Sequence, residues 1–77
     1  MAAKPYNGHP SWAAWNVALW IGNDEGLYHL ALECNRVHSN VQAAARMFTR
    51  NVGAERTPDG ARYSLRSVSL ALSGLKE

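Results

Sequence analysis

The fold of this chain is decided by residues 11–28, which carry three tryptophans and a tyrosine and read SWAAWNVALWIGNDEGLY. Trp12, Trp15 and Leu19 recur at helical spacing, and a second apolar series lies beside them. Ser11 precedes the run and belongs to the residue types that favour a helix N-cap. The pattern predicts a largely enclosed helix whose inward stripe contains Trp12 and Trp15.

A second helix is predicted directly after the first. Gly22 and Asn23 are suited to end the first helix, and Asn23 or Asp24 can cap the next. An acidic residue here is favourable at the positive end of the helix dipole. The predicted inward stripe is Leu27, Leu30, Ala31 and Cys34.

A third helix is predicted over residues 41–52. Ser39 and Gln42 match the capping box, in which a serine hydroxyl and a glutamine three residues on satisfy backbone donors. Arg46 and Arg50 fall one turn apart on one face of this helix. The predicted packing residues are Val41, Ala44, Ala45 and Phe48.

A turn is predicted at Thr57-Pro-Asp-Gly60, because proline stands at the second position and glycine at the fourth, as in a type I turn. The sequence on both sides of the turn predicts a short β-hairpin. Residues 64–75 fit two patterns, a helical spacing of apolar residues and a strand-like alternation of Val68, Leu70 and Leu72. We favour the helix, because Ser64 can cap it and a lone C-terminal strand would lack a partner.

The expected fold is mainly α-helical: a compact bundle of about four short helices with a hairpin around Thr57–Gly60. With 77 residues the chain has room for one domain, which we expect over residues 11–77, behind a flexible N-terminal arm at residues 1–10. Cys34 is the only cysteine, so no intrachain disulfide can form, and a reducing cytoplasm is the expected compartment. No signal peptide or membrane span fits the sequence.

Residues with catalytic chemistry do not form a constellation. His9, His29 and His38 fall on three separate predicted segments without metal-ligand spacing. Cys34 lies on an apolar stripe, where a buried structural role is favoured over a nucleophile. We therefore expect no enzyme activity, no cofactor and no metal site.

Binding is the better supported function class. The net charge is +2, and six of the eight basic residues are arginines, whose planar, fork-shaped donors suit carboxylates and phosphates. Trp20 lies off the inward stripe and could complete an apolar face for dimerisation or partner binding, or could simply pack. The predicted partner-binding residues are Trp20, Arg46, Arg50, Arg56, Arg62 and Arg66. A solvated polar face is the alternative reading of the arginines.

Three segments of the chain carry a resemblance to a known family. Residues 11–28 are similar to the signature SWxAWNVALWxxNDEGLY of a small protein family from phages, prophages and other mobile elements, and residues 57–63 and 69–75 are similar to that family as well. The chain resembles the anti-CRISPR proteins of the type I-C class. This resemblance implies a protein of the bacterial host cytoplasm that binds Cas subunits of the Cascade complex and blocks recognition of the PAM and target DNA by steric occlusion.

Other partners stay open at this point. Many such inhibitors imitate DNA with an acidic surface, from which this basic chain departs. The alternative is a small nucleic-acid-binding accessory protein of a phage or plasmid. A dense basic stripe or a nucleic-acid-binding motif is missing, so a protein partner is favoured over DNA. A homodimer is also compatible with so small a core.

Overall fold

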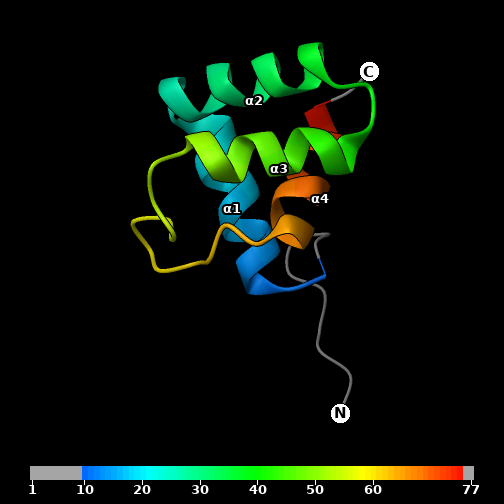
Figure 1. Cartoon of the computed structure of the whole chain (residues 1–77). Coiled ribbons are helices and arrows are strands. Elements are labelled where there is room, and N and C mark those ends of the chain that lie inside the picture. The colour runs from blue at the N-terminus through cyan, green and yellow to red at the C-terminus, as the bar shows by residue number, and fades with distance from the viewer. Residues whose placement is uncertain (1–9, 76–77) are drawn as a thin grey trace.

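The computed structural model describes residues 10–75, which form four helices (Figure 1). The helices are α1 (Trp12–Asn23), α2 (Glu25–Val37), α3 (Val41–Asn51) and α4 (Leu65–Leu75). They close into a ring in which α1 packs on α2 and α4, and α3 packs on the same two neighbours. The predicted arm lies outside the described residues except for Pro10, which is exposed. Among residues 10–75, no helix has the length and apolar character needed to span a bilayer.

The first helix begins as predicted but turns a different side to the core. The Ser11 Oγ accepts a hydrogen bond from the backbone N–H of Ala14 at 3.1 Å, which confirms the N-cap. The apolar side chains buried from α1 are Ala14, Val17 and Ile21. These positions gather on one side of a helix that advances about 100° per residue.

The predicted inward stripe of α1 is wrong. Trp12 is 42% exposed and Leu19 is 37% exposed, on the side opposite the buried apolar residues of α1, while Trp15 is half-buried. Residues 12–23 contain no charged side chain, so the helix is apolar around most of its circumference and its sequence does not mark an outer face. The apolar side chains that α1 buries are alanine and β-branched residues, whose small or compact shape allows close packing of neighbouring helices.

The second helix follows the prediction closely. Asp24 is its N-cap, and the Asp24 Oδ1 accepts a hydrogen bond from the backbone N–H of Leu27 at 2.9 Å. Ala31 and Cys34 are buried, and Leu27 and Leu30 pack against the core from partly buried positions. The predicted inward stripe of α2 is therefore confirmed.

The third helix is confirmed in its packing and corrected in its cap. Ala44, Ala45 and Phe48 are fully buried. The N-cap is Asn40, whose Oδ1 accepts hydrogen bonds from the backbone N–H groups of Gln42 at 2.8 Å and of Ala43 at 3.1 Å. The capping box from Ser39 is wrong, because Asn40 stands immediately before the first helical residue and its short side chain reaches both free donors.

The predicted β-hairpin is wrong, although the turn at its centre exists. The Gly60 N–H donates to the Thr57 carbonyl at 2.8 Å, and Gly60 has φ +99°. Beyond the turn, the described residues hold only one isolated antiparallel bridge, between Arg56 and Arg62, and no strand. Pairing stops there because this segment buries side chains in the helical core, among them Tyr63, before α4 begins. Residues 10–75 are thus all-α.

The favoured helical reading of residues 64–75 is confirmed. The Ser64 Oγ accepts a hydrogen bond from the backbone N–H of Ser67 at 3.1 Å, which caps α4. Val68 and Leu72 are fully buried, and they join Phe48 of α3 in the core. Figure 1 shows α4 crossing behind α3 at a steep angle.

Candidate functional site

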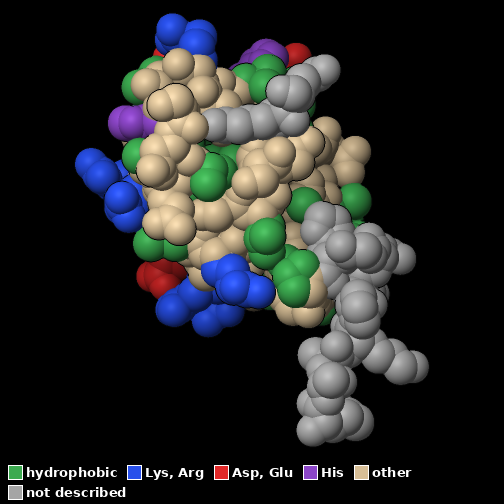
Figure 2. Space-filling model, turned by 90° about the vertical axis from the view of Figure 1, so that its right-hand side faces the viewer, with side chains coloured by type: hydrophobic (Ala, Val, Ile, Leu, Met, Phe, Trp, Pro, Cys, Tyr) green, Lys and Arg blue, Asp and Glu red, His purple; other side chains and the backbone are tan. Residues whose placement is uncertain are grey.

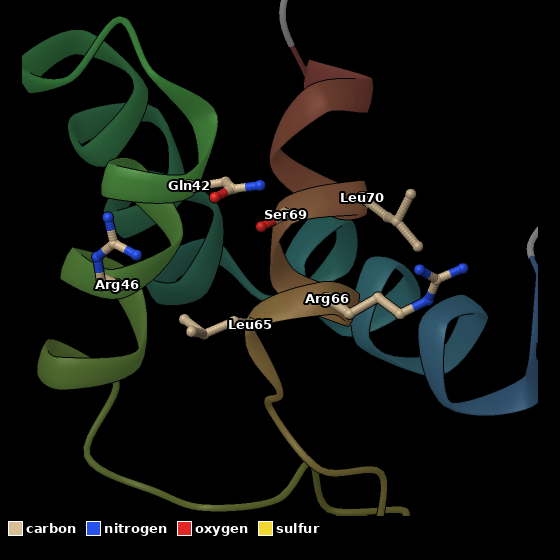
Figure 3. Close-up of a pocket in the computed structure, with 6 residues that line it drawn as sticks. All are labelled: Gln42, Arg46, Leu65, Arg66, Ser69 and Leu70. Carbon is tan, nitrogen blue, oxygen red and sulfur yellow. The ribbon is translucent and has the colours of Figure 1, made fainter.

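One of two grooves on the surface is formed by α3 and α4, and we call it the α3–α4 groove (Figure 3). Its volume is about 370 Å³. It is lined by Gln42, Arg46, Leu65, Arg66, Ser69 and Leu70. Helix geometry explains the set, because side chains four residues apart lie on the same face: α3 contributes one such pair and α4 contributes two.

The lining residues present mixed chemistry. In Figure 3 the side chains of Gln42 and Ser69 point toward each other from the two helices, and Leu65 points toward α3. Arg66 and Leu70 lie on the side of α4 away from α3. Leu65 is 47% exposed, so the groove combines two arginines with accessible apolar surface.

A second groove, of about 470 Å³, adjoins the first at Leu65. It brings Arg62 to the same side of the molecule, but its lining also includes the carboxylate of Glu55. Three of the five predicted arginines, Arg46, Arg62 and Arg66, thus line one or other of two adjoining grooves.

The other two predicted arginines lie outside both grooves. Arg50 is exposed in the last turn of α3. The Arg56 Nη1 donates to the Gly60 carbonyl at 3.1 Å, which ties this side chain to the turn. The sequence could not separate these arginines from the groove residues, because the separation depends on how α3 and α4 cross.

Charge is distributed unevenly along the described chain. Residues 41–75 carry five arginines against Glu55 and Asp59, whereas residues 10–40 carry three carboxylates against Arg36, which pairs with Glu33. Within residues 10–75, none of the other five arginines forms an ion pair with a carboxylate. On the face drawn in Figure 2, basic side chains gather along the left and lower edges, and hydrophobic side chains form separate small patches. The α3–α4 side of the molecule is therefore positively charged and available to an anionic partner.

Trp20 occupies a different environment from the arginines. Its Nε1–H donates to the Asp59 Oδ2 at 2.9 Å, and the Asn16 Nδ2 donates to the same oxygen at 2.9 Å. The Thr57 Oγ1 donates to the Asn16 Oδ1 at 2.6 Å and accepts from the Ala61 N–H at 3.0 Å. These contacts, which we call the Asn16–Asp59 network, fasten the turn to α1.

The Asn16–Asp59 network joins two of the three segments that carry the family resemblance, residues 11–28 and residues 57–63. Sequence reasoning did not find it, although Asn16 offered a signal. It is the one polar residue inside an apolar run and is only 1% exposed, and a buried amide needs partners. The network gives Trp20 a structural role on α1, away from the residues that line the two grooves.

Hydrogen bonds from Asn16 and then Trp20 lower the pKa of Asp59 below its ordinary value of 3.8. Because the folded-state pKa is depressed, the network stabilises the fold above pH 3.8, and this contribution is lost as the pH falls through the lower folded-state value. We expect the NMR signal of the Trp20 indole N–H to shift on acidification with a midpoint below 3.8. The Asp59→Asn variant should abolish this titration, and the indoles of Trp12 and Trp15 serve as internal references. A midpoint at or above 3.8 would contradict the network.

The described residues contain no group of three or more histidine, cysteine, aspartate or glutamate side chains placed to hold a metal ion. Cys34 is buried on α2, and burial, followed by the nearby charge of Glu33, raises the pKa of its thiol. A raised pKa disfavours the thiolate, which is the nucleophilic form of cysteine. The chemistry of the site is therefore that of arginine donors and apolar contacts.

Comparison with known proteins places the chain in a family. The model of a family of unknown function, DUF7249, matches residues 2–72. No curated protein and no solved structure matches the chain. Since the match covers most of the 77 residues, the chain belongs to the DUF7249 family.

Proposed function

We propose that this protein acts by stoichiometric binding to an acidic surface of a protein partner, and that the partner is the type I-C Cascade complex of a bacterial host. Binding to an acidic surface is supported by the arginine-rich α3–α4 side. Arg46 and Arg66 line one groove there, and no carboxylate is among its lining residues. The resemblance to type I-C anti-CRISPR proteins supports Cascade as the partner.

Steric occlusion is the mechanism that this charge distribution favours. Arginine binds carboxylates through two parallel hydrogen bonds, and opposite charge also speeds the encounter of two proteins. Five arginines against two carboxylates in residues 41–75 make this side unsuited to imitating DNA. The protein would instead seat on an acidic patch of a Cas subunit and cover the neighbouring PAM-binding site.

A gel-shift titration tests this proposal. Adding the protein to purified type I-C Cascade with labelled PAM-containing DNA is expected to abolish the Cascade–DNA shift at about stoichiometric amounts. The double variant Arg46→Glu, Arg66→Glu should fold normally, because both side chains are exposed, and should inhibit about tenfold more weakly. An unchanged Cascade–DNA shift at excess wild-type protein would refute inhibition before DNA capture.

A control lane with protein and DNA alone addresses the rival function, a nucleic-acid-binding accessory protein. Phosphate contacts would produce a shift in that lane, and its logarithmic affinity would fall linearly with the logarithm of salt concentration. Our proposal expects no shift in the control lane. A salt-sensitive shift there would favour the rival.

A further inference from the structure

We infer that the α3–α4 groove binds a short segment of a protein partner in which carboxylates flank a leucine-sized side chain. This inference rests on the proposed function in one respect, that the protein acts by binding an acidic protein. It goes further in naming the groove and the chemistry of the segment, and it does not depend on the partner being Cascade.

The charge of the groove indicates the flanking carboxylates. Arg46 lies on α3, and Arg66 lies on the side of α4 away from α3, so positive charge lies on both of the helices that form the groove. Its six lining residues include no acidic side chain, and neither arginine pairs with a carboxylate within residues 10–75. The adjoining groove is less suited, because Glu55 is among its lining residues and would repel an anionic segment.

The apolar part of the groove indicates the central side chain. Leu65 and Leu70 are two of the seven large apolar residues that are exposed in the described chain. Covering them removes apolar surface from water, which is worth roughly 25 cal/mol per Å². A phosphate backbone would leave this surface unused, and no aromatic side chain lines the groove as a platform for stacking bases.

The remaining lining residues and the size of the groove indicate a peptide segment. Gln42 and Ser69 face each other and offer both donors and acceptors to a partner's main chain. The volume of about 370 Å³ is near the lower end of the range for ligand sites, about 300–1,000 Å³. The groove therefore suits a few side chains of a segment and is too small to enclose a folded domain.

NMR titrations of the full ¹⁵N-labelled chain test the inference without Cascade. The probes are a peptide that alternates glutamate pairs with leucines, a polyglutamate peptide of equal charge and an oligothymidylate of equal charge. We expect the glutamate–leucine peptide to shift the side-chain amide of Gln42 and the backbone amide of Ser69, with an affinity about tenfold higher than that of either control probe. Equal affinity for polyglutamate, stronger binding of the oligothymidylate or the absence of shifts would each overturn the inference.

Matched variants then locate the contact. Arg46→Glu should weaken binding of the glutamate–leucine peptide about tenfold, whereas Arg50→Glu, with the same charge change on the same helix, should have an effect of about twofold or less. Leu65→Ser, which keeps the charge and changes the leucine that points toward α3, should also weaken binding of this peptide. Equal losses for Arg46→Glu and Arg50→Glu would show a diffuse charge effect and refute the groove.

The two proposals fail separately. If the peptide binds specifically in the groove but the protein does not inhibit Cascade, Cascade is rejected as the partner and the groove remains supported as a peptide-binding site. If the protein inhibits Cascade and Arg46→Glu does not weaken that inhibition, the proposed function is supported and the groove is rejected as the binding site.

Discussion

The Phe48→Ala variant is expected to be largely unfolded at 25 °C. Phe48 is fully buried on α3, and its ring lies against that of Tyr63 with 5.9 Å between the ring centroids. Removing such a side chain from a core costs about 3–5 kcal/mol. A single core in a domain below about 80 residues supplies roughly the same amount, so the substitution cancels most of the free energy of unfolding. Circular dichroism with urea titration measures the loss.

Trp12→Ala is the matched control for this prediction. Both substitutions remove an aromatic ring from a helix, but Trp12 is 42% exposed whereas Phe48 is fully buried. We expect the Trp12→Ala variant to have a free energy of unfolding lower than that of the wild type by about 1 kcal/mol or less. If Trp12→Ala proved as damaging as Phe48→Ala, the orientation of α1 described above would be wrong. A cooperative transition near the wild-type midpoint for Phe48→Ala would contradict the assignment of the core.

The second large effect is expected for Thr57→Val, which keeps the shape of the side chain and removes its hydroxyl. The Thr57 Oγ1 donates to the Asn16 Oδ1 and accepts from the Ala61 N–H, and Thr57 and Asn16 are both buried. Valine would leave two buried polar groups without these partners, at about 1–3 kcal/mol for each. We expect a total loss of about 2–6 kcal/mol in the free energy of unfolding.

Thr49→Val provides the control, because it makes the same chemical change on α3. The Thr49 Oγ1 donates to the Arg46 carbonyl in an exposed part of the helix, and water can replace that contact. Thr49→Val should lower the free energy of unfolding by about 0.5 kcal/mol or less. Hydrogen exchange gives a local measurement: in Thr57→Val the Ala61 amide should exchange faster, while amides near Thr49 stay unchanged. Equal stability losses in the two variants would refute the special role of the Asn16–Asp59 network.

The sequence predicted the helices whose polar and apolar faces are clearly separated. In α2 and α3 the buried positions recur at helical spacing between charged or polar residues, so the inward stripes through Ala31 and Ala44 were predicted correctly. Residues 12–23 offer no such contrast, because they lack charge altogether. The orientation of α1 is set by which side chains allow close contact with α2 and α4, and this information is not periodic.

The loop shows a different limit of sequence reasoning. Proline and glycine specify a turn locally, and the bond between the Gly60 N–H and the Thr57 carbonyl confirms it. Whether strands extend from a turn depends on what the flanking side chains contact. Here Thr57 is engaged by Asn16 of α1, 41 positions away in the chain. A local pattern could not predict that contact.

Sequence reasoning named arginines as candidate binding residues, but it could not tell which residues line the groove together. Arginine chemistry drew attention to Arg46 and Arg66, and the packing of two helices brings both to one groove. The same reasoning could not set apart Arg56, whose guanidinium is bonded to the turn. It also missed Leu65, because an apolar residue at helical spacing is expected in the core, whereas this one is exposed beside the arginines.

The connection between α1 and α2 consists of one residue, Asp24. Its backbone N–H donates to the Trp20 carbonyl at 2.9 Å, its own carbonyl accepts from the Tyr28 N–H at 2.8 Å, and its side chain caps α2. Any cut or insertion at this position would disrupt the end of one helix and the start of the next together. In a circular permutant, new termini therefore belong in the stretch 53–55, which is exposed and lies outside the helices.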